Sequence, residues 1–197
     1  MRVECERWDT RTNPATLRHN GSVGKSHRGK LLIASPVLSD FFERAVVLLL
    51  EHNHEEGAMG LVLNRSSDTR VAEAVPTLSD LGEDGEVIRV GGPVGQNSVV
   101  ALGEFDNLEE SSRPVIGDLG VLDPDRTESL RRLRVYAGHA GWAPGQLESE
   151  LEQDAWVVAQ SHPGDPFHEG DLWADALARM GGKYALLATM PADPSLN

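Results

Sequence analysis

The sequence predicts an α/β fold of the mixed α+β kind, a compact layered sandwich in which short helices flank a mixed sheet. Three observations support this prediction. The chain has 197 residues, a length that favours one compact domain. From Lys30 onward, short apolar runs alternate with short amphipathic segments. Hydrophobic residues make up 40% of the chain and aromatic residues only 5%, so aliphatic side chains must fill the core.

The first half of the body predicts a hairpin between short helical pieces. The apolar run at 45–51 is continuous, as in a strand that is buried on both faces. The polar turn that follows it leads into another apolar run, which is typical of a β-hairpin. The expected elements are, in order, a strand at 31–34, a helical turn at 40–44, a strand at 45–51, a polar turn at 52–57, a strand at 59–64, a helix at 71–75 and an acidic loop at 80–86.

The second half repeats this mixture. Asp123 followed by Pro124 predicts a helix start, with Leu130 and Leu133 on one face of the helix. Gly181 and the glycine after it predict the end of a C-terminal helix. The expected elements are strands at 87–90 and 98–103, a short helix from 123, a strand at 133–137, a turn at 138–145, a helix at 146–153, a strand at 155–159 and a helix at 172–180.

The charge of the chain is unevenly distributed. The formal net charge is −13. Residues 1–30 hold seven basic and three acidic side chains, which leaves 11 basic and 28 acidic ones in the rest. A body at −17 repels polyanions, so direct nucleic-acid binding is disfavoured. Residues 1–28 combine dispersed charges with small polar residues, and we expect them to form a flexible N-terminal extension. Residues 29–197 are then a single domain.

The absence of long apolar runs predicts a cytoplasmic location. The first 30 residues contain no signal-like apolar segment, and the longest apolar run, at 45–50, is too short to span a bilayer. Because Cys5 is the single cysteine, it cannot form a disulfide within the chain.

Three groups of residues resemble functional sites. His52 and His54 lie among glutamates, and two imidazoles with a carboxylate could hold a divalent metal ion. The tip of a polar hairpin explains the same residues without a metal, and this interpretation is favoured. The glycines that follow residue 90 suit a tight turn better than a phosphate loop, because Pro93 offers no amide donor. Alternating carboxylates from Glu148 to Asp154 are expected on the solvated face of a helix.

The order of several segments resembles the YqgE/AlgH family of bacterial proteins. The most distinctive block is 136–150, Tyr-Ala-Gly-His-Ala-Gly-Trp-Ala-Pro-Gly-Gln-Leu-Glu-Ser-Glu. Blocks at 29–36, 47–53, 57–65 and 91–94 also agree, so the resemblance covers about residues 29–190. It implies a compact mixed α/β protein and supplies no established reaction, cofactor or catalytic residue.

Three functional hypotheses follow. The favoured one is a binding or regulatory protein, rather than an enzyme, that acts through a protein or small-molecule partner and needs no cofactor. The alternatives are a metal-dependent or hydrolytic enzyme that uses the His52 and His54 loop, and a regulator that binds DNA directly. If a binding site exists, we expect it where the glycine-rich turns meet. The candidate residues are Gly91, Gly92, Pro93, Gly138, Gly141, Trp142 and Gln146.

Overall fold

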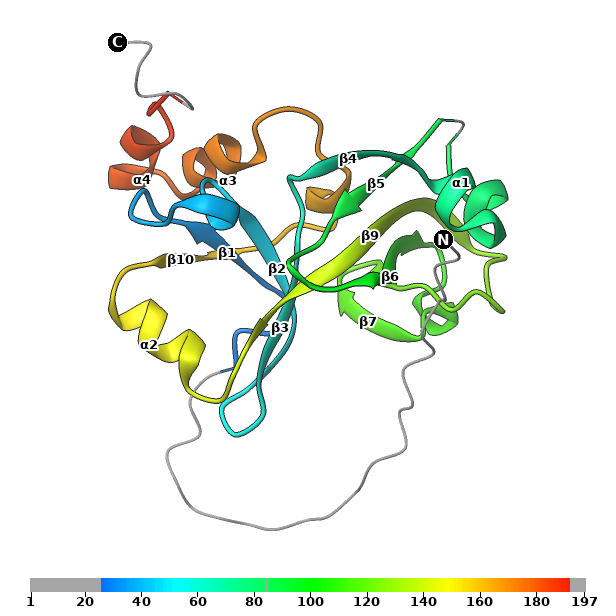
Figure 1. Cartoon of the computed structure of the whole chain (residues 1–197), viewed down its shortest axis with the longest axis horizontal. Helices are drawn as coiled ribbons and strands as arrows, with labels where there is room; N and C mark the ends of the chain where they lie inside the picture. The colour runs from blue at the N-terminus through cyan, green and yellow to red at the C-terminus, as the bar shows by residue number, and fades with distance from the viewer. Residues whose placement is uncertain (1–25, 84, 192–197) are drawn as a thin grey trace.

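The computed structural model describes residues 26–83 and 85–191. Within these residues the chain forms ten strands, four α-helices and four short 3-10 helices (Figure 1). The strands are β1 (Lys30–Ala34), β2 (Val46–Asn53), β3 (Gly57–Val62), β4 (Ser66–Arg70), β5 (Val87–Val90), β6 (Val94–Phe105), β7 (Arg113–Ile116), β8 (Leu119–Val121), β9 (Leu130–Trp142) and β10 (Trp156–Gln160). The helices are η1 (Asp40–Phe42), α1 (Val71–Ala74), η2 (Pro76–Leu81), η3 (Leu108–Glu110), α2 (Gln146–Glu152), η4 (Asp165–Phe167), α3 (Leu172–Met180) and α4 (Gly182–Leu187).

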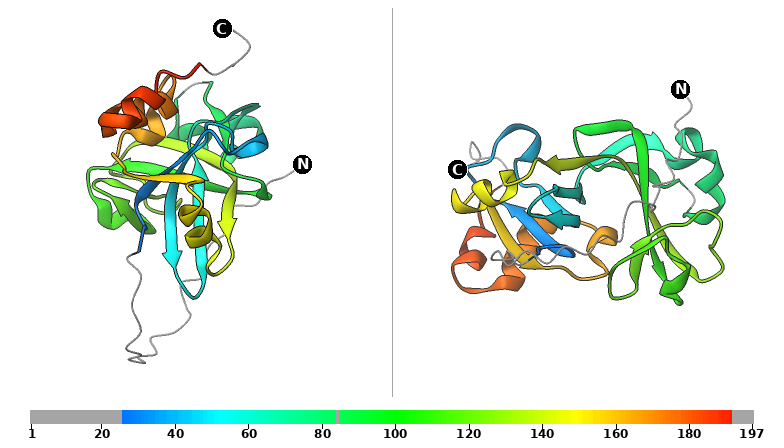
Figure 2. Two further views of the ribbon diagram at one scale, coloured as in Figure 1. Left: turned by 90° about the vertical axis from the view of Figure 1, so that its left-hand side faces the viewer. Right: turned by 90° about the horizontal axis from the view of Figure 1, so that it is seen from below.

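The predicted mixed α+β fold is confirmed. The sheet runs in the order β10-β1-β2-β3-β9-β6-β8-β7, with β4 and β5 attached beside β9. Strand β5 pairs with β9 in parallel, whereas the other pairs are antiparallel, so the sheet is mixed. The N-terminal part of β9 pairs with β6 and its last residues pair with β3. Strand β9 therefore joins two groups of strands, which are visible as two lobes in Figure 2. The first lobe contains β10, β1, β2 and β3, and the second contains β4, β5, β6, β7 and β8.

The first lobe has three layers. Along β1, Leu31 and Ile33 belong to the core cluster on one face of the sheet, whereas Leu32 and Ala34 belong to the cluster on the other. Helix α3 covers the first face, because its Trp173 is part of that cluster. Helix α2 covers the opposite face. This arrangement follows from the period-two alternation of side chains along a strand. The second lobe has its own core cluster between the sheet and α1 with η2.

Two sequence predictions in the second half of the chain are wrong. No helix starts at Asp123: its carboxylate instead accepts a hydrogen bond from the Asp125 amide in a turn, because an Asp-Pro pair suits turns as well as helix starts. Leu130 and Leu133 belong to β9. The expected turn at 138–145 is strand as far as Trp142. Gly138 has φ of 69°, which allows the strand to bend there without ending.

Three strands were missed by the sequence patterns. Strand β4 is polar throughout, with the sequence Ser-Ser-Asp-Thr-Arg, and its residues are exposed or half-buried. Strands β7 and β8 are only four and three residues long. None of the three offers the apolar alternation that identifies a strand in a sequence.

Part of the predicted extension at 1–28 lies outside the described residues, and so does Cys5. Residues 26–28 are described and are bound to β2. The amide of His27 donates to Nδ1 of His52 at 2.9 Å, and Nε of Arg28 donates to the carbonyl of Leu50 at 3.1 Å. These three residues therefore pack along the sheet.

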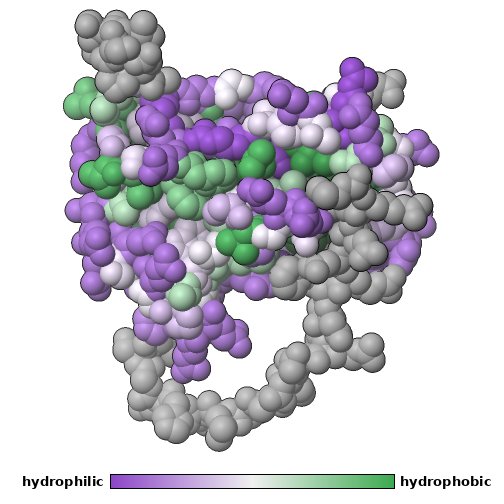
Figure 3. Space-filling model, viewed as in Figure 1, coloured by the Kyte–Doolittle hydropathy of each residue, from purple (hydrophilic) through white to green (hydrophobic). Residues whose placement is uncertain are grey.

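The outer surface is mostly hydrophilic on the face shown in Figure 3, where a narrow band of hydrophobic residues crosses the middle. This is expected of a protein that encloses its apolar side chains between layers. Among the described residues, no helix has the length and apolar character needed to cross a membrane.

Candidate functional site

In the predicted glycine-rich site, the turn at 91–93 lies directly against β9 at Gly138 and His139. Val94 at the start of β6 pairs with His139 of β9. A Cβ atom on Gly91 would lie 2.3 Å from the carbonyl oxygen of Gly138, and one on Gly92 would lie 2.0 Å from the carbonyl carbon of His139. The structure thus brings the 91–93 turn together with Gly138. Because backbone fills the space between them, this crossing is closely packed.

Trp142 and Gln146 belong to a second cluster, centred on Glu150. One carboxylate oxygen of Glu150 accepts the indole N–H of Trp142 at 2.8 Å and that of Trp156 at 2.7 Å. The other oxygen accepts the amide of Gln146 at 3.0 Å, and the Gln146 carbonyl accepts the amide of Ala143. These bonds hold α2 against the sheet. The prediction of a solvated face is therefore wrong for Glu150.

The histidine loop meets α2 through Glu148. The same oxygen of Glu148 lies 3.0 Å from Nε2 of His52 and 2.9 Å from Nδ1 of His54. Because Nδ1 of His52 accepts the His27 amide, a neutral His52 ring carries its proton on Nε2 and donates it to Glu148. The prediction of a solvated face is wrong for Glu148 as well.

This geometry does not favour a metal at the loop. The His52 side chain is 5% exposed and both of its ring nitrogens are engaged, so it offers no free lone pair. In the described part of the chain, no group of three or more His, Cys, Asp or Glu residues is arranged to hold a metal ion. The candidate metal ligands His52 and His54 instead share a carboxylate.

The shared carboxylate makes stability depend on pH. Desolvation tends to raise the pKa of Glu148, but hydrogen bonds from His54, its own backbone amide and His52 outweigh this and lower the pKa. A carboxyl with a lowered pKa stabilises the fold above its unfolded value of about 4.3, and this contribution is lost as the pH falls through the folded pKa. We expect the difference in unfolding free energy between wild type and Glu148→Gln to shrink from about pH 5 to about pH 3.

Urea unfolding at fixed ionic strength measures this difference. Glu152→Gln is the control for the loss of one charge, because Glu152 lies on the same helix and its side chain is exposed. A difference for Glu148→Gln that stays constant across this pH range would contradict the expectation.

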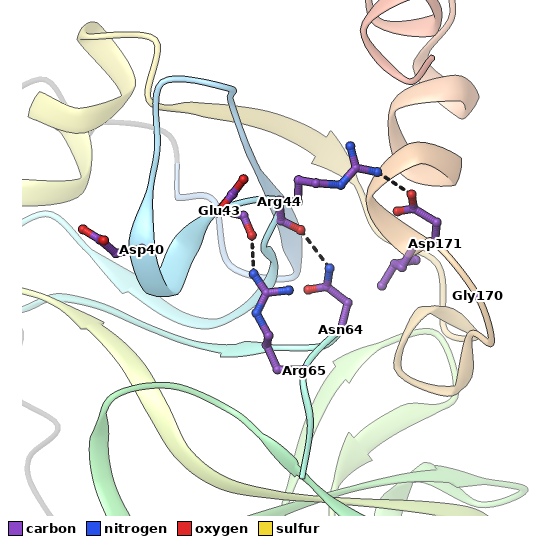
Figure 4. Close-up of a pocket in the computed structure, with 8 residues that line it drawn as sticks. Asp40, Glu43, Arg44, Asn64, Arg65, Gly170 and Asp171 are labelled. Carbon is purple, nitrogen blue, oxygen red and sulfur yellow. Dashed lines mark hydrogen bonds and ion pairs between the residues drawn. The ribbon is translucent and has the colours of Figure 1, made fainter. Parts of the chain in front are cut away.

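A cavity lies elsewhere, between the start of β2, the end of β3 and the start of α3. Its volume is about 400 Å³, which is within the range of small-molecule sites. Figure 4 shows polar and charged side chains around it, drawn from three separate parts of the chain. The lining residues are Asp40, Glu43, Arg44, Asn64, Arg65, Gly170, Asp171 and Leu172. We refer to it as the Arg44–Arg65 cavity.

Backbone strain is concentrated at this cavity. In the described chain, three residues other than glycine have positive φ, and two of them, Asp40 at 56° and Arg44 at 52°, line the cavity. A left-handed residue with a side chain costs about 1–2 kcal/mol. Such strain persists only where the surroundings enforce it, and it is often found at functional sites.

The side chains that follow β3 hold the strained turn in place. The amide nitrogen of Asn64 donates to the carbonyl of Arg44 at 2.8 Å, and its oxygen accepts the Val46 amide at 3.0 Å. The guanidinium of Arg65 donates to the carbonyl of Glu43. The turn at 40–44 is therefore clamped to the neighbouring strand by two side chains.

The two arginines of the cavity differ in their partners. Arg44 stacks on Trp173 with 4.0 Å between guanidinium and ring centre, and it donates to Asp171 and to the Met190 carbonyl. Arg65 forms no ion pair with a described carboxylate and contacts the Glu43 carbonyl. In Figure 4 the Asp40 carboxyl points away from the Arg65 guanidinium. Burial lowers the pKa of Arg65, although the charge of Glu43 acts in the opposite direction. A half-buried cation with unused donors is thus the main chemical feature of this cavity.

The sequence patterns missed this cavity, although they contained a usable signal. In a β-hairpin the start of one strand lies beside the end of the other. Arg44 precedes β2, and Asn64 and Arg65 follow β3, so the predicted hairpin already places these polar residues side by side. None of the seven predicted site residues lines this cavity, and their role in binding stays a prediction.

Comparison with known proteins places the chain in a family. The sequence profile of the family DUF179, described as AlgH-like, matches residues 31–185. The chain belongs to the AlgH-like family. A UPF0301 protein of Streptomyces coelicolor is 42% identical over 184 residues, which cover 86% of this chain and 94% of that protein. A UPF0301 protein of Thermobifida fusca is 36% identical, with the same coverage of both chains. The resemblance stated from the sequence is confirmed, and these names assign no activity.

Two solved structures share the fold. A crystal structure of a Corynebacterium diphtheriae protein has a TM-score of 0.75 at 29% identity and covers 88% of this chain and 95% of its own. The solution structure of a protein named AlgH from Pseudomonas aeruginosa has a TM-score of 0.64 at 29% identity, with coverage of 88% and 98%.

Proposed function

We propose that this AlgH-like protein is a cytoplasmic, non-catalytic binding protein that takes a small oxyanion-bearing ligand, a carboxylate or phosphate compound, in the Arg44–Arg65 cavity. The observation that carries this proposal is the Arg65 guanidinium, which is half-buried, lines the cavity and has donors left after its single described hydrogen bond. An oxyanion can accept two parallel N–H bonds from a guanidinium.

The electrostatics of the cavity support this ligand class. The charge of Asp171 is matched by Arg44, which is fixed by its stacking on Trp173. Partial burial of Arg65 disfavours its charged form, as the direction of its pKa shift indicates. A bound anion would offset this desolvation cost, because an opposite charge favours the charged form. Binding of an anion therefore gains from a cation that forms no ion pair with a described carboxylate, in a lining where Asp40 and Glu43 also contribute negative charge.

A binding role is favoured over a catalytic one by the side chains in the cavity. Its lining contains no serine, cysteine, histidine or lysine, so the hydroxyl, thiol, amine and imidazole groups that often act as nucleophile or base are not among its walls. The histidines of the 52–54 loop are bound to Glu148, on α2. A regulatory effect would then be exerted through a partner that senses the bound state.

Titration with inorganic phosphate and with citrate tests the proposal. At low ionic strength we expect saturable binding to wild type and at least a tenfold loss of affinity in Arg65→Gln, since a tenfold change corresponds to about 1.4 kcal/mol and a charge-assisted hydrogen bond contributes more. Isothermal titration calorimetry measures the affinity, and circular dichroism checks that the variant is folded.

Arg70→Gln is the matched control. Arg70 is exposed at the end of β4, and its replacement changes the net charge by the same amount. We expect less than a twofold change in affinity for this variant, because Arg70 is exposed to solvent and does not line the cavity. Equal losses in the two variants, or no saturable binding of either anion to wild type, would overturn the proposal.

A further inference from the structure

A second pair of arginines lies on the sheet, on strands that are parallel neighbours. Arg89 is on β5 and Arg134 is on β9. Both reach the same oxygen of Glu169, Arg134 at 3.1 Å and Arg89 at 3.8 Å. Arg134 also contacts Glu86 at 3.3 Å, and Arg89 donates to the Ser66 hydroxyl at 2.6 Å. Two guanidinium groups thus converge on one carboxylate.

The two carboxylates that face this pair are not equivalent. The Glu86 side chain is 6% exposed, whereas that of Glu169 is 78% exposed. Glu86 is therefore a fixed part of the interior, and Glu169 reaches the arginines from the surface. An ion pair with so exposed a partner is weak and easily exchanged. If Glu169 moves away, two cations face one buried carboxylate, and the site carries an uncompensated positive charge.

The arginines also have unused hydrogen-bonding capacity. Both side chains are 15% exposed. Among the described residues, the Nε atoms of Arg89 and Arg134 are buried and lack a hydrogen-bond acceptor. Buried polar groups without partners are uncommon and call for an explanation. Because the Nε atoms are buried, a ligand would bind the terminal Nη2 groups of Arg89 and Arg134, which face Glu169.

The position of Glu169 connects this pair with the Arg44–Arg65 cavity. Glu169 directly precedes Gly170 and Asp171, and both of these residues line the cavity. Consecutive Cα atoms are 3.8 Å apart, so the segment that supplies the carboxylate is also part of the cavity wall. A ligand in the cavity and a ligand at the arginine pair would contact opposite ends of the same short segment.

We propose that Arg89 and Arg134 form a second oxyanion subsite, which the carboxylate of Glu169 occupies from within the chain, and that the ligand carries two acidic groups. One group binds Arg65, and the other displaces Glu169. The Arg65 half of this assignment rests on the proposed function, whereas the Arg89–Arg134 half stands on its own contacts. The ligand class is thus a dicarboxylate or another compound with two separated oxyanions.

Glu169→Gln tests the subsite with inorganic phosphate as the probe. Removing the internal carboxylate is expected to raise the phosphate stoichiometry from one to two per chain, measured by calorimetry. Glu109→Gln is the matched control, since Glu109 is an exposed carboxylate on η3 and makes the same change in net charge. We expect the stoichiometry of this control to stay at one. A stoichiometry of one with unchanged affinity in Glu169→Gln would overturn the subsite.

The double variant Arg65→Gln with Glu169→Gln separates the two proposals. It should bind one phosphate, at the Arg89–Arg134 subsite. If phosphate binds to Glu169→Gln but not to wild type, the subsite stands and the proposed function fails. If wild-type binding depends on Arg65 but is insensitive to Glu169→Gln, the proposed function stands and the subsite fails.

Ligand class is tested on wild type with dicarboxylates and monocarboxylates of matched length, from succinate to suberate. At least one dicarboxylate is expected to bind tenfold more tightly than its monocarboxylate, because the second group binds intramolecularly. Equal affinities at every length would overturn the assignment of a ligand with two acidic groups.

Discussion

Gly138→Ala is expected to lower the free energy of unfolding by about 4 kcal/mol, a large share of the 5–15 kcal/mol typical of a domain. A Cβ atom at this position would lie 2.5 Å from the carbonyl oxygen of Gly92 and 2.8 Å from that of Val94. Backbone atoms in the middle of a sheet cannot move aside as a flexible side chain can. The substitution would therefore separate β9 from the start of β6. Chemical denaturation of wild type and variant measures the effect.

Gly145→Ala separates this crowding from backbone strain. Gly145 has φ of 75°, close to the 69° of Gly138, but a Cβ atom there would meet no atom within 4 Å. We expect this control to cost only about 1 kcal/mol, the strain of a left-handed alanine. Equal losses in the two variants would show that the crossing of Gly138 and Gly92 is not closely packed.

Glu150→Ala is expected to cost about 3 kcal/mol, because it leaves two buried indole N–H groups without an acceptor. Trp142 and Trp156 are 6% and 4% exposed, and their rings pack edge to face with 5.9 Å between centres. Water cannot easily replace the lost carboxylate at such a place. Denaturation, together with the tryptophan fluorescence of the native state, reports the loss.

Glu152→Ala is the control on the same helix. Its side chain is exposed, and surface substitutions of this kind usually change stability by about 0.5 kcal/mol or less. If Glu150→Ala proved as mild as Glu152→Ala, the two indole hydrogen bonds would not hold α2 to the sheet.

The strands and helices that are predicted correctly from the sequence are those whose pattern of apolar side chains matches the faces that the fold buries. Residues 45–50 are apolar because both faces of the sheet are covered at β2, and Leu172, Leu177 and their neighbours repeat at helical spacing because one face of α3 is buried. Strand β4 carries no such pattern, because its residues are polar and exposed or half-buried. The sequence predicts a turn at Gly138, where β9 in fact continues, because a glycine signal does not distinguish a left-handed residue within a strand from the end of a strand.

The contacts of the candidate sites were less predictable than the fold. Glu148 and Glu150 looked like solvated helix residues because their partners, His52 and Trp156, are distant in the sequence or on another element. The strained turn that ends at Arg44 has no signature in its residue types, since its conformation is imposed by Asn64 and Arg65. Side-chain contacts across elements follow from strand order, which local patterns do not contain.

A phosphate titration followed through the Nε–H resonances of the arginine side chains tests most directly whether the Arg44–Arg65 cavity binds oxyanions. The resonance of Arg65 is expected to shift along a saturable curve, with the dissociation constant that calorimetry gives. The resonance of the exposed Arg70 should move little and without saturation. Saturable binding that leaves the Arg65 resonance unmoved would contradict the assignment of this cavity as the binding site.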